Sequence, residues 1–573
     1  MEEFIPVSAA RHEPVAARES ARPQRRPDVD TTVDVVVVGG GPGGQATALF
    51  CAWRGLDVML LEKAPELGGT GRKAAFACWA PNNRWLRETG VEDPEEDFLR
   101  FAARTARPER YDPQSPTFGQ PAWEFELLRT IYRSDAEAVE LLHDSGALRF
   151  QHERVHGEYW PNLPENRVTA GRALFPEGVN ETRTNGGPIA MDSLAAAIDE
   201  AGVDVRVGHR VQRVIVDDER VTGVVATTID GSALRVGARV GTVFATGGFT
   251  HDQELVDNFL GHPSAGGGAA LTNTGDFVRI AGTVGAQLRN MQEAWCGPIN
   301  LVKSLRRDPT MQITVLRAGD SMICVNYKGE RVLNEKLPYN EFVASMQAWD
   351  PVACERPNRV MIQIWDEHTQ LNSAMPNDTG GSAVLPPDQQ DDQIVRGNSL
   401  DELAQALTAK LAGLRSHTGD LTLATDFVPT LQATIARFND LARVGVDADF
   451  HRGDRGVERT MFAGPVADEP DKVNPVLYPI TPTGPYYATL LVPGTLDTKG
   501  GPKTDAAGHV VDDVDAPIHG LYGVGNCVAS PSASAYWAAG GTIGPIFGFA
   551  LRTAEELTRV SDPTTPLAVG AGA

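Results

Sequence analysis

The fold of this chain is decided by the stretch Asp34-Val35-Val36-Val37-Val38-Gly39-Gly40-Gly41-Pro42-Gly43-Gly44. Its four consecutive valines predict a buried parallel strand, and a helical pattern over residues 45–54 follows the glycines directly. A G-x-G-x-x-G pattern between a strand and a helix is typical of proteins that bind a dinucleotide. In that motif Gly39 permits the tight turn, Gly41 lets a pyrophosphate approach the backbone, and Gly44 lets the helix pack against the strand. The phosphates then bind amides at the helix N-terminus, where the helix dipole favours anions.

A second strand is predicted at residues 58–61 and ends at Glu62. This places a carboxylate about 20 residues after the glycines, where it can accept hydrogen bonds from a ribose. A second glycine pair follows in Gly68-Gly69-Thr70, and such a pair is more typical of flavin-binding proteins than of nicotinamide dehydrogenases. The alternative is a glycine-rich turn in an ordinary α/β protein. Strand, helix, acid and second glycine pair together favour a Rossmann-like α/β domain.

Composition narrows the class of protein. A chain of 573 residues is too long for one compact core, so we expect two or more domains. The formal net charge of −23 argues against binding to nucleic acid or to an anionic membrane. The six cysteines form no C-x-x-C pair, which argues against a disulfide framework and a zinc site. Cysteines of this kind suit a reducing compartment, and we expect a cytoplasmic protein.

The two ends of the chain differ from the rest. Residues 1–31 are rich in Ala, Arg, Glu and Pro and lack an apolar core, so we expect a disordered tail rather than a signal peptide. We expect a flexible tail at residues 561–573 as well. No stretch of eighteen apolar residues occurs, and therefore no transmembrane segment is predicted.

The pattern between the tails predicts one domain interrupted by another. Residues 32–290 and 481–560 are expected to form the two parts of the dinucleotide-binding domain, and residues 291–480 an inserted α+β domain. In the first part we expect helices at 94–106, 124–145, 191–201 and 277–284, and strands at 203–207, 211–216, 221–228 and 241–248. Asp276 is placed to cap the helix at 277–284. In the insert we expect a hairpin of strands 322–326 and 331–335, a Pro- and Gly-rich loop at 375–398, and helices at 400–414 and 428–444.

Several motifs resemble those of fumarate reductase/succinate dehydrogenase-type flavoproteins, from about residue 33 to residue 559. Besides the first glycine motif they are Gly68-Gly69-Thr70, Ala245-Thr246-Gly247-Gly248 and Gly523-Val524-Gly525-Asn526. Within that superfamily the chain is most similar to the 3-ketosteroid Δ1-dehydrogenases. This likeness rests on Asn334-Glu335-Lys336-Leu337-Pro338-Tyr339 and on Tyr536-Trp537-Ala538-Ala539-Gly540-Gly541-Thr542-Ile543-Gly544. The resemblance implies a glutathione-reductase-type FAD-binding domain with an inserted substrate domain.

The resemblance also implies FAD as the cofactor. We expect FAD to be held without a covalent bond, because no histidine lies near the loop at 68–70, where related flavoproteins attach one. The implied cofactor-binding residues are Gly39, Gly41, Pro42, Gly43, Gly44, Glu62, Lys63, Gly69, Thr70, Val211, Ala245, Thr246, Gly247, Asp276, Gly525, Asn526, Thr542 and Ile543.

Four residues are implied for catalysis. In the family, the tyrosine that corresponds to Tyr339 abstracts a proton, while the hydroxyl of Tyr536 and the amide of Gly540 would hold the substrate carbonyl. A third tyrosine of the family assists the base. A plain alignment puts Asn162 at its position, and Tyr159 is close by, so both remain open and Tyr159 is the candidate that we carry forward.

The expected chemistry sets requirements that these residues can be tested against. A tyrosine has a pKa near 10 in water, so it needs a lowered pKa or a proton relay to act as a base. The developing enolate needs hydrogen-bond donors, and an uncharged substrate needs apolar walls. The candidates for those walls are Trp79, Trp295, Phe249 and Trp537, and for each of them the alternative is plain core packing.

Differences from the family bear on the substrate. Dicarboxylate-reducing relatives carry arginine where Tyr339 stands and another at residues 536–538, so fumarate and succinate are disfavoured as substrates. Trp537 replaces the usual proline and changes the pocket wall. We therefore expect an FAD enzyme that desaturates an apolar cyclic ketone and uses an external electron acceptor or donor. The alternatives are an enone or acrylate reductase of the same superfamily, a biosynthetic desaturase of a non-steroid cyclic ketone, and a flavin-binding protein without turnover.

Other chemistries find no support in the sequence. There is no G-x-S-x-G around the serines near residue 532, no H-E-x-x-H, and no Cys/His cluster with metal-ligand spacing, so no metal is expected. Four histidines are interpreted as surface or structural residues: His156, His209, His251 and His451.

Overall fold

The structure is a computed structural model. It describes residues 29–152, 157–168, 170–181, 183–306, 315–317, 319–374, 381–382, 384–390, 392–460 and 472–562. The predicted tails fall largely outside these ranges, as do His156 and part of the predicted loop at 375–398. Within these ranges, no helix combines the length and the apolar composition that crossing a bilayer requires.

The valine strand lies at the centre of the larger sheet. Strand β1 (Thr31–Val38) pairs in parallel with β2 (Val58–Leu61) on one side and with β9 (Ala233–Phe244) on the other. The valines at 35–38 are at most 5% exposed, which explains their uninterrupted apolar run. Helix α1 (Pro42–Ala52) follows, with Gly41 as its N-cap and Pro42 at its first position, where a missing N–H is tolerated. The predicted α/β fold is confirmed.

Distant parts of the chain build this sheet together. The parallel strands are completed by β6 (Asp204–Arg206) beside β2 and by β20 (Pro517–Gly523) beside β9, and β19 (His509–Val511) runs antiparallel at the edge. The first half of β9 also pairs with β8 (Arg220–Thr227), which pairs with β7 (Arg210–Asp217). The carboxyl ends of β1, β2, β9 and β20 therefore lie along one edge, where such sheets bind ligands.

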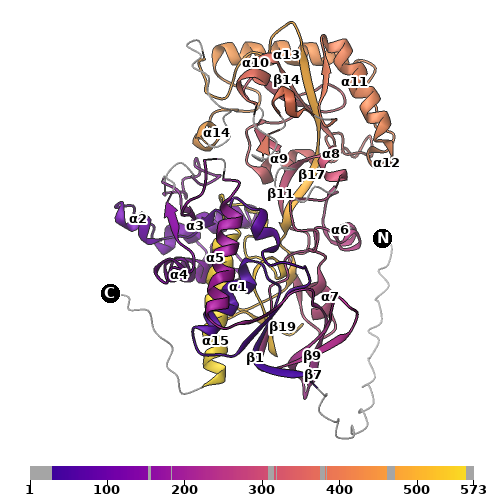
Figure 1. The fold of residues 1–573 in the computed structure, drawn as a ribbon. Helices are drawn as coiled ribbons and strands as arrows, with labels where there is room; N and C mark the ends of the chain where they lie inside the picture. Colours follow the sequence, from indigo (N-terminus) through magenta and orange to yellow (C-terminus); the bar gives the residue numbers. More distant parts are fainter. Residues whose placement is uncertain are drawn as a thin grey trace, which may run out of the picture.

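Helices cover one face of the larger sheet (Figure 1). Helix α1 packs against α5 (Gly186–Glu200) and α15 (Ile543–Ser561), and α15 packs in turn against α4 (Ala122–Asp144). The smaller elements of this half are η1 (Gly69–Lys73), β3 (Cys78–Trp79), α2 (Arg84–Glu88), α3 (Glu95–Ala106), β4 (Phe150–His152), β5 (Ala173–Pro176), α6 (Gln253–Phe259), α7 (Asp276–Gly282), β10 (Leu288–Arg289), β18 (Gly501–Pro502) and η4 (Gly525–Cys527).

A second sheet forms the upper body in Figure 1, drawn largely in orange. Its strands are β11 (Ala294–Asn300), β17 (Tyr486–Thr498), β14 (Met361–Asp366) and β13 (Met322–Val325), with β16 (Val395–Gly397) also paired to β17. Helices α11 (Leu400–Gly413) and α13 (Phe427–Val444) bury their apolar side chains against it. The other elements are α8 (Leu301–Leu305), β12 (Val315–Arg317), α9 (Tyr339–Met346), α10 (Glu367–Asn372), β15 (Gly381–Ser382), η3 (Pro387–Gln389), α12 (Arg415–Thr418) and α14 (Gly456–Thr460).

Strand β17 connects the two bodies of the protein, of which one is built on the larger sheet and the other on the second sheet. Its first residues pair with β14, and its last pair with β11, with Thr498 opposite Ala294. Near that end, the Asp497 carboxylate accepts a hydrogen bond from the Gly248 amide of the larger body. The predicted boundary between 480 and 481 thus precedes a strand that belongs to the second sheet.

Two local predictions were wrong. Strand β13 pairs with β14, and the predicted strand at 331–335 contributes only an isolated bridge between Arg331 and Val325. The reason is an ion pair from Arg331 to Glu335, four residues on, which a strand would hold far apart. Asp276 does not cap α7: the N-cap is Gly275, and the Asp276 carboxylate bonds Lys63 instead.

Candidate active site

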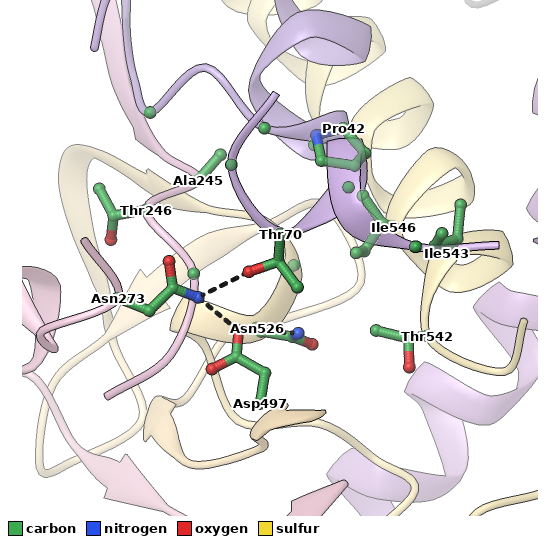
Figure 2. A pocket seen from close by; sticks show the side chains of 18 of the residues that line it. Pro42, Thr70, Ala245, Thr246, Asn273, Asp497, Asn526, Thr542, Ile543 and Ile546 are labelled. Atoms are coloured by element: carbon green, nitrogen blue, oxygen red, sulfur yellow. Dashed lines mark hydrogen bonds between the residues drawn. The ribbon is translucent and has the colours of Figure 1, made fainter. Parts of the chain in front are cut away.

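A single elongated cavity runs along the carboxyl ends of the parallel strands to a group of aromatic side chains. Its lining includes Val38, Leu61, Phe244 and Val524, from the ends of β1, β2 and β9 and just after β20. Every residue of the predicted cofactor and catalytic sets lines this cavity except Gly44. Figure 2 shows the part of it between the helix that begins at Pro42 and the turn at Asn526.

The two glycine motifs lie side by side in the wall of this cavity. A Cβ on Gly41 would meet nothing closer than 3.9 Å, and one on Gly69 would lie 3.9 Å from the Gly41 backbone, so both backbones stay open to a ligand. Gly44 has a different role: a Cβ there would lie 1.8 Å from the Gly39 carbonyl oxygen. Gly44 therefore packs helix against strand, as the motif requires, and does not line the cavity.

Polar groups gather where the ribose of a dinucleotide would lie. The Glu62 carboxylate accepts hydrogen bonds from the amides of Gly40, at 2.6 Å, and Ala64, at 2.7 Å. Asp276 pairs with Lys63 and Arg210, each at 2.8 Å, and these cations hold the pKa of Asp276 below its ordinary value against the effect of burial. His209, interpreted from sequence as a structural residue, lines this end as well.

Three tyrosines meet at the other end of the cavity. The ring centroids of Tyr159 lie 5.7 Å from those of Tyr339 and 5.4 Å from those of Tyr536, both in edge contact, and Tyr339 lies 5.7 Å from Tyr536. Trp295 packs its edge against Tyr536 at 4.9 Å. Asn162, the alternative to Tyr159, is exposed. The structure thus places Tyr159, and not Asn162, with the other two tyrosines.

A buried ion cluster includes Glu158, the residue before Tyr159. Arg172 binds Asp93 through two hydrogen bonds of 2.7 Å and Glu158 through one of 2.5 Å, and all three side chains are at most 1% exposed. The Tyr159 amide donates to the Trp537 carbonyl oxygen at 2.9 Å. These contacts fix the segment on both sides of the Tyr159 side chain. Burial raises the pKa of Tyr159 well above its ordinary value.

The polar residues of the motif before Tyr339 form buried hydrogen bonds and ion pairs. Asn334 donates to Glu458, Glu335 pairs with Arg331 and Arg452, and the Lys336 ammonium donates to the Gly319 carbonyl oxygen at 2.6 Å. All of these side chains are buried or nearly so. The polar residues of the motif therefore fix the start of α9, whose first residue is Tyr339.

Tyr536 is held by the turn that follows β17. The buried Lys499 ammonium donates to the carbonyl oxygens of Ala535, at 2.6 Å, and Ala533, at 2.9 Å, and lies 4.2 Å from the Trp295 ring centroid. Burial lowers the pKa of Lys499 to about 8. Burial also raises the pKa of Tyr536.

Gly540 is required by its surroundings. Its φ is +86°, and a Cβ would lie 2.6 Å from the Ala77 backbone. The Gly540 carbonyl oxygen accepts from the Trp79 amide, at 3.1 Å. Among the hydrogen bonds of the described residues its own amide has no acceptor, so that this N–H stays available beside the cavity it lines.

Of the four aromatic side chains proposed as walls, only Trp295 lines the cavity. Trp79 and Trp537 are fully buried and stack on each other at 5.1 Å, and Phe249 is buried in the core beside β11. For Trp79, Trp537 and Phe249 core packing is therefore the correct interpretation. Residues next to a site motif can pack behind that motif without reaching the cavity. The apolar lining comes instead from Phe76, Ala77 and Leu496, which carry no motif signal, and from Ala539 of the motif at 536–544.

Sequence reasoning also missed two polar residues in the cavity wall. The Asn273 amide donates to Thr70 at 3.2 Å and to Asp497 at 2.8 Å, as Figure 2 shows. Asp497 directly precedes the sequence Thr498-Lys499-Gly500-Gly501, whose glycine pair indicates a turn, and that position was the only available signal. In the described residues no group of three or more His, Cys, Asp or Glu side chains is arranged to hold a metal ion, and all six cysteines are free.

Residues 34–543 match a family described as "FAD binding domain". The chain belongs to this family. A 4-oxocyclohexanecarboxylate 2-dehydrogenase of Sinomonas cyclohexanicum is 30% identical to this flavoprotein, over 93% of this chain and 97% of the relative. A 3-oxosteroid 1-dehydrogenase of Mycolicibacterium smegmatis is 28% identical, over 91% and 97% of the two chains.

Solved structures agree with these relatives. A 3-ketosteroid delta1-dehydrogenase from Sterolibacterium denitrificans, in complex with 1,4-androstadiene-3,17-dione, matches this flavoprotein with a TM-score of 0.76 and 25% identity, over 92% of this chain and 99% of the other. The resemblance inferred from the motifs is confirmed. The protein is an FAD-dependent dehydrogenase or reductase that acts on CH–CH donors.

Proposed function

We propose that this flavoprotein removes two hydrogens from the CH–CH bond next to the carbonyl of an apolar cyclic ketone, with Tyr339, Tyr536, Gly540 and Tyr159 as its catalytic residues. One observation carries the proposal. Three tyrosines from separate segments meet within 5.4–5.7 Å at the end of the cofactor cavity, beside a glycine whose amide is available.

The opposite end of the cavity fits FAD. The open glycine backbones lie at the N-terminus of α1, where a pyrophosphate would meet amides, and Glu62 lies beyond them for a ribose. The Thr246 hydroxyl, in the cavity wall, is a buried polar group without a hydrogen-bond partner among the described residues, as expected where a ligand supplies one. When bound there, FAD accepts a hydride from the substrate. No histidine lies between residues 69 and 77 along the cavity, which supports non-covalent binding.

The three tyrosines differ in their burial, and this difference assigns their proposed roles. Tyr159 is 0% and Tyr536 6% exposed, whereas Tyr339 is only half-buried. A phenolate is less costly in the more solvated position, so Tyr339 takes the proton from the carbon next to the carbonyl. The raised pKa of Tyr536 keeps it protonated, and it donates with the Gly540 amide to the oxygen on which negative charge develops. Tyr159 touches both rings and assists Tyr339 as the base.

The lining around the tyrosines suits an uncharged ring. Phe76, Ala77, Trp295 and Leu496 supply apolar surface, and no arginine lines the cavity among the described residues. The relatives act on a single-ring and a four-ring ketone by their names. We propose a cyclic ketone of this range as the substrate, and an external acceptor for the electrons.

The test is an anaerobic titration of the FAD-bound protein. Each ketone of a panel is added in turn: 4-androstene-3,17-dione, 4-oxocyclohexanecarboxylate and 4-methylcyclohexanone. The proposal predicts that at least one of the two uncharged ketones bleaches the flavin absorbance and yields its enone or dienone, whereas bleaching by the carboxylate alone would contradict an apolar substrate. If every ketone leaves the flavin oxidised while enones reoxidise the chemically reduced protein, the enzyme is a reductase instead.

A further inference from the structure

A buried carboxylate without a partner cation lies in the wall of the cofactor cavity. Asp497, the last residue but one of β17, is 2% exposed and lines the cavity. Five donors meet it: Gly248 N at 3.0 Å, Asn273 Nδ2 at 2.8 Å and Asn526 Nδ2 at 3.1 Å on Oδ2, and Thr498 N at 2.9 Å and Thr250 Oγ1 at 3.1 Å on Oδ1. Among the described residues, no Lys, Arg or His forms an ion pair with Asp497.

The hydrogen bonds at Oδ2 favour an ionised Asp497, because all three partners of that oxygen are donors. The Trp295 indole N–H can only donate, and it bonds Asn526 Oδ1 at 3.1 Å, so the Asn526 NH₂ group must face Asp497. Gly248 and Thr498 present backbone N–H groups, which also can only donate. A proton on the carboxyl would therefore meet donors at Oδ2. Burial raises the pKa of Asp497, while five hydrogen bonds to its charged form oppose that effect.

This charge sits between the two ends of the cavity. Through Asn526 it is linked to Trp295, which contacts Tyr536, and through Asn273 it is linked to Thr70 in the second glycine motif. Figure 2 shows Asn273 joined to both Thr70 and Asp497. A charge in a buried, largely apolar cavity acts on its neighbours far more strongly than one in water.

We propose that Asp497 lowers the reduction potential of the bound FAD. Two-electron reduction to the anionic form takes up two electrons and one proton, and so adds one negative charge to the flavin. A fixed carboxylate in the cavity wall repels that charge and disfavours the reduced form. Asp497 thereby makes the flavin a weaker oxidant and a better donor to an external acceptor. This inference needs FAD in the cavity but holds for any substrate.

The experiment is a reductive titration of the FAD-bound protein without ketone. Xanthine and xanthine oxidase supply the electrons, and a reference dye reports the midpoint potential. Asp497→Asn should shift the midpoint potential to a more positive value by at least about 30 mV. For two electrons this corresponds to a change of about tenfold in the reduction equilibrium. Asp513→Asn removes an exposed carboxylate and should leave the midpoint unchanged.

A charge swap separates electrostatics from disturbed packing. In the double variant Asp497→Asn, Asn526→Asp, the carboxylate moves to position 526 and the hydrogen bond between the two side chains is kept in reverse. Its midpoint should return towards that of the parent. If Asp497→Asn retains FAD poorly, Asp497→Ser replaces it as the neutral variant and should shift the midpoint in the same direction. A neutral variant with the parent midpoint, or a double variant that stays with the single one, would overturn the proposal. Because no ketone is present, a failed substrate panel would leave this result standing.

Discussion

The rings of Tyr339 and Tyr536 lie 5.7 Å apart and are inclined by 40°, although one begins a helix of the second body and the other precedes the last helix of the chain. Asn340 links their two segments: its Nδ2 donates to the Ser534 carbonyl oxygen at 2.7 Å, and its Oδ1 accepts from the Cys296 amide at 3.1 Å. The proposed base and the proposed carbonyl-binding donor are therefore held against each other where the two sheets of the protein meet.

Removal of the base is the first prediction. Tyr339→Phe deletes the proposed proton acceptor but keeps the ring that packs against Tyr159 and Tyr536. We expect kcat to fall by about a hundredfold or more, the usual scale for a lost general base. Substrate should still bind and perturb the flavin spectrum. Exchange of the α-proton with deuterium, without net oxidation, measures this step apart from hydride transfer, and exchange at the parent rate would show that Tyr339 is not the base.

The carbonyl donors should behave differently. Tyr536→Phe removes one of two donors whose contribution grows as charge develops on the oxygen, so a loss of roughly 2.7–4 kcal/mol in transition-state stabilisation is expected. Because Gly540 still offers its amide, some activity should survive. Steady-state kinetics separate a transition-state effect from a ground-state effect: kcat should fall, whereas KM should change much less. A purely higher KM would place Tyr536 in ground-state binding instead.

The sequence indicated the site where short patterns carry the geometry. The run from Val35 to Gly44 specifies a buried strand, a turn and a helix in one segment, so local chemistry alone decides its structure. Tyr339 and Tyr536 were reached through motifs, and the polar residues 334–336 of the first motif form the buried contacts that hold Tyr339 in place. Their catalytic roles stay predictions until the variants are measured.

The rest depended on contacts between distant segments. Asp497 and Asn273 are single polar residues, and nothing in a strand or a loop signals that five donors converge on one of them. Trp79 and Trp537 were proposed as walls, yet their mutual stacking buries both, and only tertiary packing decides that. The strand predicted at 331–335 failed for a similar reason, because the contacts of Glu335 with Arg331 and Arg452 outweigh the local preference.

Glu62 provides a test of cofactor binding. Glu62→Ala removes the expected ribose partner together with the acceptor of the Gly40 and Ala64 amides. Hydrogen bonds to charged groups contribute roughly 1.5–3 kcal/mol, so FAD affinity should fall about tenfold to a hundredfold. Titration of apoprotein with FAD, followed by flavin fluorescence, measures this loss. Glu62→Gln keeps one acceptor and should lose less, whereas equal affinity in all three proteins would place the ribose partner elsewhere.

Glu341 should make stability depend on pH. Its Oε2 is buried without a hydrogen-bond partner among the described residues, and burial raises its pKa from 4.5 to about 7. The folded protein therefore holds this proton more tightly than the unfolded chain. The resulting stability is fully present below about pH 4.5 and is lost as the pH rises through 7. Glu341→Gln should therefore raise the thermal midpoint more at pH 8 than at pH 5. At pH 8 the gain in the free energy of unfolding should reach at most about 3 kcal/mol. The exposed Glu88→Gln is the control, and an identical pH profile for all three proteins would contradict the assignment.

The last prediction concerns the buried cluster that precedes Tyr159. Arg172→Met keeps the apolar volume of the side chain but leaves Asp93 and Glu158 buried without their cation. Breaking such a cluster costs about 3–5 kcal/mol, because the carboxylates lose their charge compensation and not merely one contact. The matched control is Arg167→Met, since Arg167 is exposed and pairs with Asp97 at 3.4 Å, an arrangement worth about 0–1 kcal/mol. Urea unfolding of the FAD-bound proteins at pH 7 measures both losses. Protonation relieves an uncompensated carboxylate, which means that the Arg172→Met loss should shrink as the pH falls towards 5, while the control stays flat. A loss that is equal at both pH values would show that packing around Arg172, rather than its charge, holds the segment of Tyr159 in place.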